Sequence, residues 1–223
     1  MDNQHKPYGP YERYFKRLID IVCALFAIIV FSWLYLIVAI LVRVNLGSPV
    51  LFRQKRPGKD GKIFEMYKFR SMSNAKNQDG ELLPDTERLT KFGRFLRSTS
   101  LDELPEAFNI LLGQMSVVGP RPLAVQYLPY YNEEEIHRHD VRPGLSGLAQ
   151  VNGRNGLQWE ERFAYDLEYV NKITFLGDLN IILLTVKKAL KREDIVVRGM
   201  GKTIDFDEYR QSQMEEVEND FKR

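Results

Sequence analysis

The sequence predicts an α+β protein: a helix-rich single domain with a short β-hairpin, anchored by an N-terminal re-entrant membrane helix and by interfacial amphipathic helices. Three observations predict this fold class. A run of 22 uncharged residues, Ile21–Val42, lies near the N-terminus. Segments rich in β-prone residues flank two turn pairs between residues 50 and 72. Beyond residue 90, apolar residues recur mostly at helical spacing.

The uncharged run is long enough to enter a bilayer. As a helix it would reach about 33 Å, close to the thickness of the hydrocarbon core. It is too long for the apolar part of a secretory signal peptide, and no small-residue cleavage site follows it. A core helix of a soluble protein rarely stays apolar on every face over such a length. We therefore expect membrane insertion.

Basic residues on both flanks of the run bear on how it sits in the membrane. Lys16 and Arg17 precede it and Arg43 follows it. Because positive residues prefer the cytoplasmic side, a single span would place one basic flank on the wrong side. A helix that bends near its middle and leaves by the same face avoids this, so we favour re-entry. The run has no proline, and Ser32, whose hydroxyl can bond a backbone carbonyl, is the visible bending device.

The elements that follow are expected in this order. Residues 50–72 form a hairpin that presses against the base of the membrane helix, and residues 73–88 form a polar loop. Helices follow near Thr90–Arg97, Leu104–Leu112 and 157–171, the last with one face packed on the core.

A further helix begins near Leu179 and combines an apolar stripe with clustered lysines. It either lies in the headgroup plane or covers the core as an ordinary surface helix, and the pattern leaves both readings open.

Composition narrows the function classes. The chain holds one cysteine, Cys23, and three histidines, which excludes an intramolecular disulfide and argues against cysteine-rich or histidine-rich metal sites. Residues 205–223 carry seven acidic and three basic residues, so the rest of the chain is clearly basic. A basic body suits an anionic surface or a phosphorylated ligand. We expect an N-terminal membrane region over 1–48, a folded domain over 49–200 and a loose, acidic polar tail over 201–223.

The adjacent carboxylates Asp102 and Glu103 form the first candidate site. Ser100 and Glu103 have the spacing of a capping box, and Pro105 suits an early helical position, so both acids could serve only to cap a helix. The alternative is chemical. Two neighbouring carboxylates can hold Mg²⁺ together with phosphate oxygens, and a carboxylate can attack phosphorus as a nucleophile.

Two other segments could bind phosphate or nucleotide. In Gly119-Pro120-Arg121-Pro122, two prolines restrict the backbone around one arginine, whose guanidinium suits a diphosphate. The segment from Arg142 to Asn155 is rich in glycine, arginine and asparagine. Its backbone could approach a ligand closely, or it could be an ordinary surface loop.

Taken together and in order, the motifs resemble those of the bacterial sugar transferases, the monotopic phosphoglycosyl transferases. The similarity runs from about Tyr14 to about Lys191. The residues that carry it are Arg53-Gln54-Lys55-Arg56-Pro57-Gly58, Tyr67-Lys68-Phe69-Arg70-Ser71-Met72, Arg97-Ser98-Thr99-Ser100-Leu101-Asp102-Glu103-Leu104-Pro105, Gly119-Pro120-Arg121-Pro122, Val141-Arg142-Pro143-Gly144 and Gln150-Val151-Asn152-Gly153-Arg154.

The resemblance implies a reaction in which a UDP-sugar donates a phospho-sugar to undecaprenyl phosphate and UMP is released. Asp102 would be the nucleophile, would hold the phospho-sugar covalently and would give ping-pong kinetics. Glu103 would support it as an acid/base or orienting group, and Mg²⁺ would bind near Asp102. Other residues implied around the substrates are Lys68, Arg97, Arg121, Gln150, Asn152, Arg154 and Asp178.

The resemblance also implies a setting. The enzyme would act at the cytoplasmic face of the bacterial inner membrane, among membrane lipids, and would open glycoconjugate assembly. Downstream glycosyltransferases are possible partners, and nucleic acid is not expected. Similarity to minimal enzymes, such as the one that opens N-linked glycosylation, favours an acetamido sugar.

One departure and two alternatives stand beside this interpretation. Family members commonly have Ser-Pro in the middle of the membrane helix, where this chain has Ser32-Trp33. A non-catalytic membrane scaffold that binds UDP-sugar or partner enzymes is the alternative from another functional class. A transferase in which the lipid phosphate attacks the donor directly is the alternative within enzymes.

Overall fold

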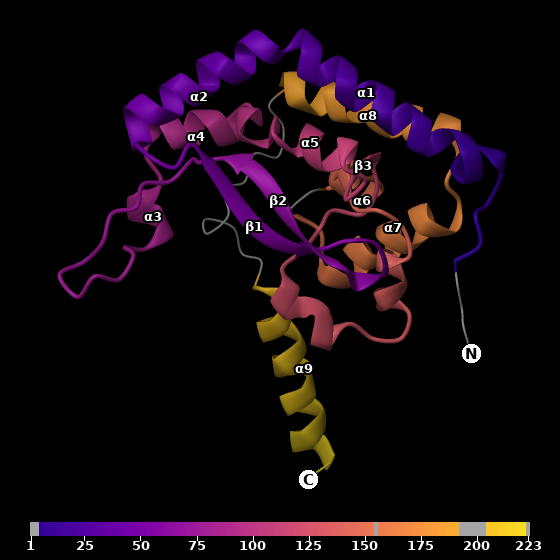
Figure 1. Cartoon of the computed structure of the whole chain (residues 1–223). Helices are drawn as coiled ribbons and strands as arrows, with labels where there is room; N and C mark the ends of the chain where they lie inside the picture. The colour runs from indigo at the N-terminus through magenta and orange to yellow at the C-terminus, as the bar shows by residue number, and fades with distance from the viewer. Residues whose placement is uncertain (1–4, 154–155, 192–203, 222–223) are drawn as a thin grey trace.

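A bent pair of helices arches over a small mixed domain in the computed structural model, which describes residues 5–153, 156–191 and 204–221 (Figure 1). The arch consists of α1 (Lys16–Val30) and α2 (Ser32–Leu46), and the hairpin of β1 (Leu51–Pro57) and β2 (Ile63–Phe69) lies beneath it. The other helices and strands are α3 (Asp85–Arg88), α4 (Lys91–Ser98), α5 (Glu106–Leu111), β3 (Ser116–Val118), β4 (Gly144–Ser146), α6 (Leu148–Asn152), α7 (Trp159–Asn171), α8 (Phe175–Lys191) and α9 (Phe206–Phe221). Short helical turns occupy η1 (Tyr11–Phe15), η2 (Lys59–Gly61), η3 (Leu101–Glu103), η4 (Val125–Tyr130) and η5 (Glu135–His139).

The predicted bend lies at Phe31, between α1 and α2. The helices Tyr11–Val30 and Ser32–Leu46 are inclined by 64°, and together they have the length and apolar composition of a membrane segment, whereas no single helix of the described residues does. The predicted cause of the bend is wrong, because the Ser32 hydroxyl makes no hydrogen bond with any described residue. Instead the Phe31 backbone leaves helical geometry, with ψ at 12°.

The predicted hairpin is confirmed, and its inward face packs on the arch. The strands pair antiparallel, with Pro57 opposite Ile63 at the turn. Because side chains alternate along a strand, Phe64 and Met66 share one face, and both are buried in a cluster with Ala24 of α1. Lys68 lies on that same face, one step further along β2.

Polar contacts fasten α1 to the domain. Asp20 is 3% exposed, and its carboxylate accepts hydrogen bonds from the Ser116 hydroxyl at 3.0 Å and the Val117 amide at 2.9 Å. Arg17, one turn earlier, donates to the Ile110 carbonyl at 2.7 Å. These bonds satisfy backbone groups at the end of α5 and the start of β3, so α1 is part of the folded domain.

A second fastening joins α2 to the segment that carries the predicted site. The Tyr35 hydroxyl donates to the Leu104 carbonyl at 2.6 Å. The Tyr35 ring also meets Phe108 edge to face, with ring centres 5.8 Å apart. The first turn after the bend in the arch therefore contacts the chain two residues beyond Asp102.

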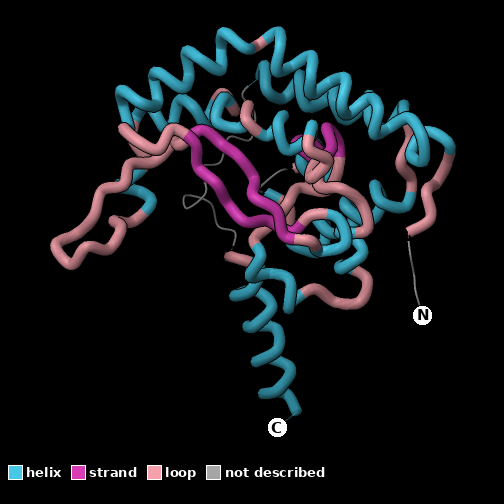
Figure 2. Tube along the Cα trace, viewed as in Figure 1, coloured by secondary structure: helices cyan, strands magenta, loops and turns pink. Residues whose placement is uncertain are grey.

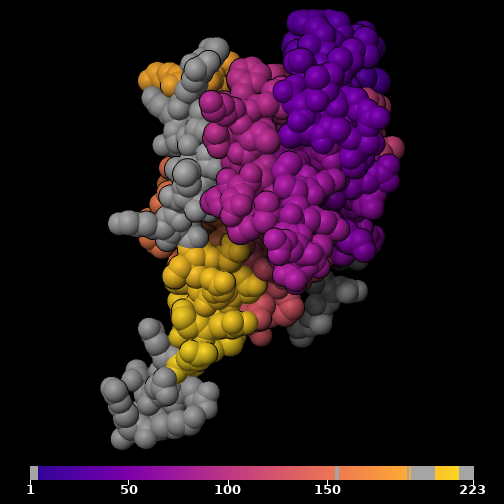
Figure 3. Space-filling model, turned by 90° about the vertical axis from the view of Figure 1, so that its left-hand side faces the viewer, coloured from indigo at the N-terminus to yellow at the C-terminus, as the bar shows by residue number. Residues whose placement is uncertain are grey.

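The predicted helix at 157–171 is confirmed as α7, and it packs with the C-terminal helix. Trp159 and Phe163 are buried in one aromatic cluster with Tyr127 and with Phe206 of α9. Phe206 has no exposed surface. The expectation of a loose tail is therefore wrong for the described part of α9. The base of α9 is seated on the domain (Figure 3), and the helix projects away from it (Figure 1).

Helix α8 (Figures 1 and 2) is tied at its start to the start of α1, because Asp178 accepts from Lys16 Nζ. It covers the core, which confirms one of the two readings that the sequence left open, and its placement in the headgroup plane stays a prediction. Its inner face covers the core through Ile181, which is 3% exposed. Its outer face leaves Leu176, Leu179 and Leu183 exposed. The stripe that marked this helix as amphipathic therefore faces largely outward.

The polar segment 73–88 is mostly irregular, as expected, and ends in the short helix α3. The helix predicted at Thr90–Arg97 is α4, and the Thr90 hydroxyl caps it by accepting from the Gly93 amide at 3.1 Å. The helix predicted to begin at Leu104 begins two residues later, at Glu106.

Candidate active site

The Asp102-Glu103 pair lies in the tight turn η3, between α4 and α5. Ser100 takes a left-handed conformation with φ of 56°, and its side chain caps nothing. The capping box suggested by the spacing of Ser100 and Glu103 is therefore not formed. The two carboxylates are released from helix capping and are directed into the domain.

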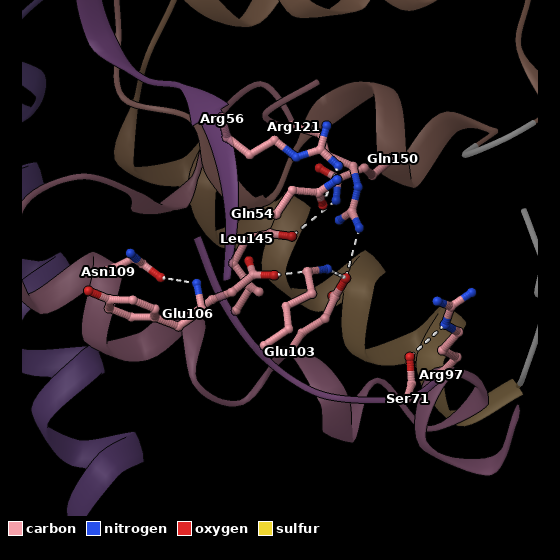
Figure 4. A network of polar contacts seen from close by, with 12 residues as sticks. Gln54, Arg56, Ser71, Arg97, Glu103, Glu106, Asn109, Arg121, Leu145 and Gln150 are labelled. Atoms are coloured by element: carbon pink, nitrogen blue, oxygen red, sulfur yellow. Dashed lines mark hydrogen bonds and ion pairs between the residues drawn. The ribbon is translucent and has the colours of Figure 1, made fainter. Parts of the chain in front are cut away.

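Glu103 joins two cations through one oxygen. Its Oε1 accepts from Lys68 Nζ and from Arg121 Nη2, each at 2.7 Å (Figure 4). Burial alone would raise the pKa of Glu103, but Arg121 and Lys68 outweigh it and hold that pKa far below its usual range. Glu103 is therefore a fixed anion that connects β2 with the loop after β3.

A third carboxylate, Glu106, completes this cluster and was not among the predicted residues. Its side chain is almost fully buried, and its Oε1 lies 3.1 Å from Lys68 Nζ as an ion pair. Burial and then the charge of Glu103 raise the pKa of Glu106 to about 7, against the attraction of Lys68 and Arg121. The three-residue spacing from Glu103 was the available signal, because it places both acids on one side of a helical turn.

Asp102 has a different environment from its neighbour. It is 7% exposed, and it makes no hydrogen bond or ion pair with another side chain of the described residues. Burial and the nearby charge of Glu103 raise its pKa to about 6, although Lys68 and Arg97 pull it down. Asp102 is thus a carboxylate close to two cations but bonded to neither.

Arg97 is held at the end of α4, where it faces the end of β2. Its Nε donates to the Ser71 hydroxyl at 2.9 Å (Figure 4). Close packing allows this contact, since a Cβ on Gly93 would meet the Ser71 carbonyl oxygen at 1.8 Å. Glycine at position 93 therefore lets α4 approach β2 and bring Arg97 near Asp102.

Arg121 leaves the carboxyl end of β3, which pairs in parallel with β4. Its carbonyl accepts from Arg138 Nη2 at 2.8 Å, and Arg138 is itself locked in a buried pair with Asp166. The Arg121 side chain is partly exposed, yet its guanidinium reaches into the domain and donates to Glu103. The flanking prolines and the buried Arg138 together fix the backbone from which the Arg121 side chain extends.

The glycine-rich segment follows the adjacent strand end. A Cβ on Gly147 would lie 2.3 Å from the Gly119 carbonyl oxygen, so the two loops pack backbone to backbone. Gln150 donates through Nε2 to the Leu145 carbonyl at 3.0 Å, whereas its Oε1 is buried without a hydrogen-bond partner among the described residues. Gln150 therefore offers an acceptor next to the loop that carries Arg121.

Asn152 and Asp178 are not part of this cluster. Asn152 donates to the Leu148 carbonyl one turn back and is exposed, and Arg154 lies outside the described residues. Asp178 is buried at the start of α8, where its carboxylate accepts from Lys16 Nζ at 2.6 Å and from the Tyr11 and Tyr169 hydroxyls. These contacts tie α8 to the start of α1.

The donor set bears on the expected metal. Among the described residues, no three His, Cys, Asp or Glu side chains are grouped to hold an ion. Mg²⁺ commonly takes only one or two carboxylates and completes its shell with water and phosphate oxygens. The unengaged carboxylate of Asp102 fits an ion that arrives with a diphosphate, whereas Glu103 Oε1 already accepts from two cations.

Comparison with known proteins points in one direction. The family model described as bacterial sugar transferase matches residues 11–192. The chain is 49% identical over 180 residues to an uncharacterized sugar transferase, EpsL, of Bacillus subtilis, covering 81% of this chain and 89% of that protein.

Two relatives whose printed names specify a reaction are considerably longer. Over 78% of this chain, 46% of residues are identical to the UDP-glucose:undecaprenyl-phosphate glucose-1-phosphate transferase of Klebsiella pneumoniae. The Escherichia coli protein of that name is 41% identical over 82% of the chain. The matched regions span 40% and 41% of the length of these two relatives.

Proposed function

The chain belongs to the bacterial sugar transferase family, and we propose that it transfers a phospho-sugar from a UDP-sugar to undecaprenyl phosphate. The products are UMP and an undecaprenyl-diphosphate sugar. The observation that carries the proposal is a buried carboxylate, Asp102, that bonds to no side chain in the described part of the chain although Lys68 and Arg97 are close. Those cations suit a diphosphate, which brings negative charge to an anionic nucleophile.

In the first step, a carboxylate oxygen of Asp102 attacks the sugar-proximal phosphorus of the donor. An oxygen–phosphorus bond forms, and the bond from that phosphorus to the bridging oxygen breaks. UMP leaves with the bonding electrons, and the phospho-sugar stays on Asp102 as an acyl phosphate. The exposed part of the Arg121 side chain and the Lys68 ammonium offer donors for phosphate oxygens.

In the second step, an oxygen of undecaprenyl phosphate attacks the same phosphorus and displaces Asp102. The diphosphate bond of the lipid product forms as the bond to the carboxylate breaks, so the enzyme returns to its starting state. Both substrates are anions, and splitting the reaction keeps them from occupying the site together. Glu103 fixes Lys68 and Arg121 beside the reacting carboxylate in both steps.

Mg²⁺ is proposed as the metal, held on the protein side by Asp102. When bound, it would offset charge on the diphosphate. The chain's own contribution is the arrangement of Lys68, Arg97 and Arg121 around Asp102, with the carboxylate left unengaged by any other side chain of the described residues.

The sugar remains to be identified. The resemblance to minimal enzymes favours an acetamido sugar, whereas the named relatives act on UDP-glucose. Gln150 Oε1 is a buried acceptor that an N–H or O–H group of the donor could satisfy. A panel of UDP-hexoses and UDP-acetamidohexoses, scored by UMP release, identifies the substrate.

The site is proposed to lie at the cytoplasmic face of the inner membrane. The outward sides of α1 and α2 expose Phe26, Ile29 and Leu36, and the outer side of α8 exposes Leu176 and Leu183. A large exposed apolar surface of this kind suits a membrane interface. The arch would dip into one leaflet and place the site near the phosphate of the lipid acceptor.

The test compares the purified full-length protein with its Asp102→Asn variant. We expect UMP release from UDP-sugar with undecaprenyl phosphate in the native protein and none in the variant. Without acceptor, the intact mass of the native protein should rise by one phospho-sugar, located on the peptide that contains Asp102.

Other results would favour the alternatives. UMP release that requires acceptor and leaves no adduct would favour direct attack by the lipid phosphate. Donor binding without any UMP release would favour a scaffold. Equal UMP release from native and variant proteins would refute Asp102 as nucleophile.

A further inference from the structure

Glu106 is a buried carboxylate for which the proposed mechanism has no use. It lies in the first turn of α5 and is 1% exposed. Its Oε1 lies 3.1 Å from Lys68 Nζ but accepts no hydrogen bond. Burying a carboxylate costs free energy even when it is paired with a cation, so the buried position of Glu106 calls for an explanation.

The position of Glu106 is fixed by the packing of α5 on β2. Asn109, on the same short helix, has no exposed surface and accepts from the Tyr67 amide at 2.9 Å. It also donates to the Glu65 carbonyl at 2.7 Å. These two bonds bracket the strand just before Lys68, so α5 and Lys68 are held in register with each other.

The two carboxylates around Lys68 differ in what else they contact. Glu103 Oε1 is shared between Lys68 and Arg121. Among the residues that the structure describes, Glu106 forms an ion pair with Lys68 alone. The Glu103 side chain is 19% exposed, against 2% for that of Glu106. An incoming diphosphate can therefore compete with Glu103 for both cations, whereas it cannot reach Glu106.

We propose that Glu106 is a positioning residue, which keeps the Lys68 ammonium beside Asp102 when the donor's diphosphate draws Lys68 away from Glu103. The inference rests on the proposed function, because it takes a UDP-sugar as the ligand. A lysine has a long, flexible side chain and three donors, so one buried carboxylate partner at 3.1 Å narrows where its ammonium lies.

The test is a double-mutant cycle on the full-length protein. Glu106→Gln, Lys68→Gln and the double variant are compared with the native chain in kcat/KM for UMP release. We expect Glu106→Gln to lower kcat/KM about tenfold when Lys68 is present and less than about twofold when it is not. A general packing role would give the same loss in both backgrounds, and that result would overturn the proposal.

The control is Glu65→Gln. Glu65 lies on β2, the strand that carries Lys68, and its exposed side chain pairs with Arg53 at 3.4 Å. The substitution makes the same chemical change on the same strand, outside the buried cluster. We expect kcat/KM within about twofold of the native value, as for surface pairs generally. If Glu106→Gln, like the control, retained the kcat/KM of the native protein, the proposal would be overturned.

A second measurement does not depend on turnover. In the Asp102→Asn background, the same cycle is followed through the Kd of the UDP-sugar by calorimetry. Glu106→Gln should weaken binding only when Lys68 is present, and equal weakening in both backgrounds contradicts the proposal. If Glu106→Gln does not fold, Glu106→Asp replaces it, because this variant keeps the carboxylate but shortens the side chain by one methylene. Glu106→Asp should weaken UDP-sugar binding less, and again only when Lys68 is present.

The outcomes for the two proposals are separable. UMP release by Asp102→Asn would refute the assignment of Asp102 as the nucleophile. The double-mutant cycle on the Kd of the UDP-sugar would still test the role of Glu106. Loss of adduct formation in Asp102→Asn, together with equal effects of Glu106→Gln in both Lys68 backgrounds, would support the reaction and refute the positioning role.

Discussion

At the residue scale, the site depends on the contrast between two adjacent carboxylates. Glu103 bonds to Lys68 and Arg121, which hold its pKa far below the usual range. Asp102 is buried without a bonded cation, and its pKa is raised to about 6. Neighbouring acids whose environments push their pKa values apart are typical of sites that assign them different tasks.

The sequence placed both acids at the site but could not assign their environments. From local spacing alone, helix capping was a serious alternative for the pair, and Ser100 looked like its hydroxyl partner. The left-handed backbone at Ser100 removes that possibility, and Glu103 instead bonds to Lys68 and Arg121, which lie distant in the chain. Glu106 was overlooked for the same reason, because its partner lies on another element.

The raised pKa of Asp102 predicts how stability depends on pH. Below about pH 4, Asp102 is protonated in both folded and unfolded chains and has no effect. Between about pH 4 and pH 6 the unfolded chain ionises first, so the free energy of unfolding falls by up to about 3 kcal/mol. Asp102→Asn should therefore be more stable than the native protein at pH 8 and equal to it near pH 4.

Thermal unfolding in detergent, without substrate or added metal, measures this difference. Asp79→Asn is the matched control, because Asp79 is exposed in the 73–88 segment. It should leave the pH profile unchanged. A stability difference between Asp102→Asn and the native protein that stays constant from pH 4 to pH 8 would contradict the prediction.

At the element scale, the arch formed by α1 and α2 is both a candidate membrane segment and a part of the core. Its bend falls where the charge pattern required one, yet Ser32 does not cause it. Hydropathy could locate the run and its flanks, because those are local properties. The carboxylate of Asp20 and the hydroxyl of Tyr35 bond to groups some 70 to 100 residues away, which no local pattern records.

Re-entry makes a prediction about which side of the membrane the two flanks occupy. Cys23 is the only cysteine, so Cys23→Ala gives a background for single-cysteine labels at the exposed positions Lys6 and Lys59. We expect neither Lys6→Cys nor Lys59→Cys to react with a membrane-impermeant thiol reagent in intact cells. Both should react after the cells are permeabilised.

The permeabilised sample is the control for reactivity, and retained UMP release is the control for folding. Labelling of Lys6→Cys in intact cells, with Lys59→Cys protected, would mean that the arch spans the bilayer. That result would leave the chemistry assigned to Asp102 unaffected, because Asp102 lies in η3, outside the arch.

At the scale of the whole molecule, an apolar face and an aromatic cluster lie on different parts of the domain. The arch and α8 expose the large apolar side chains, whereas α7 and the base of α9 supply the cluster around Phe206. The sequence predicted the stripe on α7 because Trp159 and Phe163 repeat at helical spacing. It missed the seating of α9 because the acidic composition of the tail outweighed a single buried phenylalanine.

The seating of α9 predicts that its first residue is a large contributor to stability. Phe206→Ala should lower the free energy of unfolding by about 3 to 5 kcal/mol, because Phe206 is fully buried among aromatic rings. Met214→Ala, on the same helix but exposed, should change it by less than about 0.5 kcal/mol. Thermal unfolding of the two variants in detergent measures both effects, and equal values would show that α9 is not seated in solution.

The fastening of α1 has a consequence for how the protein is made. The ribosome releases Arg17 and Asp20 long before Ile110 and Ser116, the residues whose backbone and hydroxyl groups they bond. Until Ile110 and Ser116 have been translated, these side chains of α1 can bond only to water or to other groups. In a shortened chain without that helix, the Ser116 hydroxyl and the Val117 amide would lose the carboxylate of Asp20 that accepts their hydrogen bonds. Helix α1 thus completes its bonds only after β3 has been made, and cutting α1 away would remove groups to which the rest of the domain bonds.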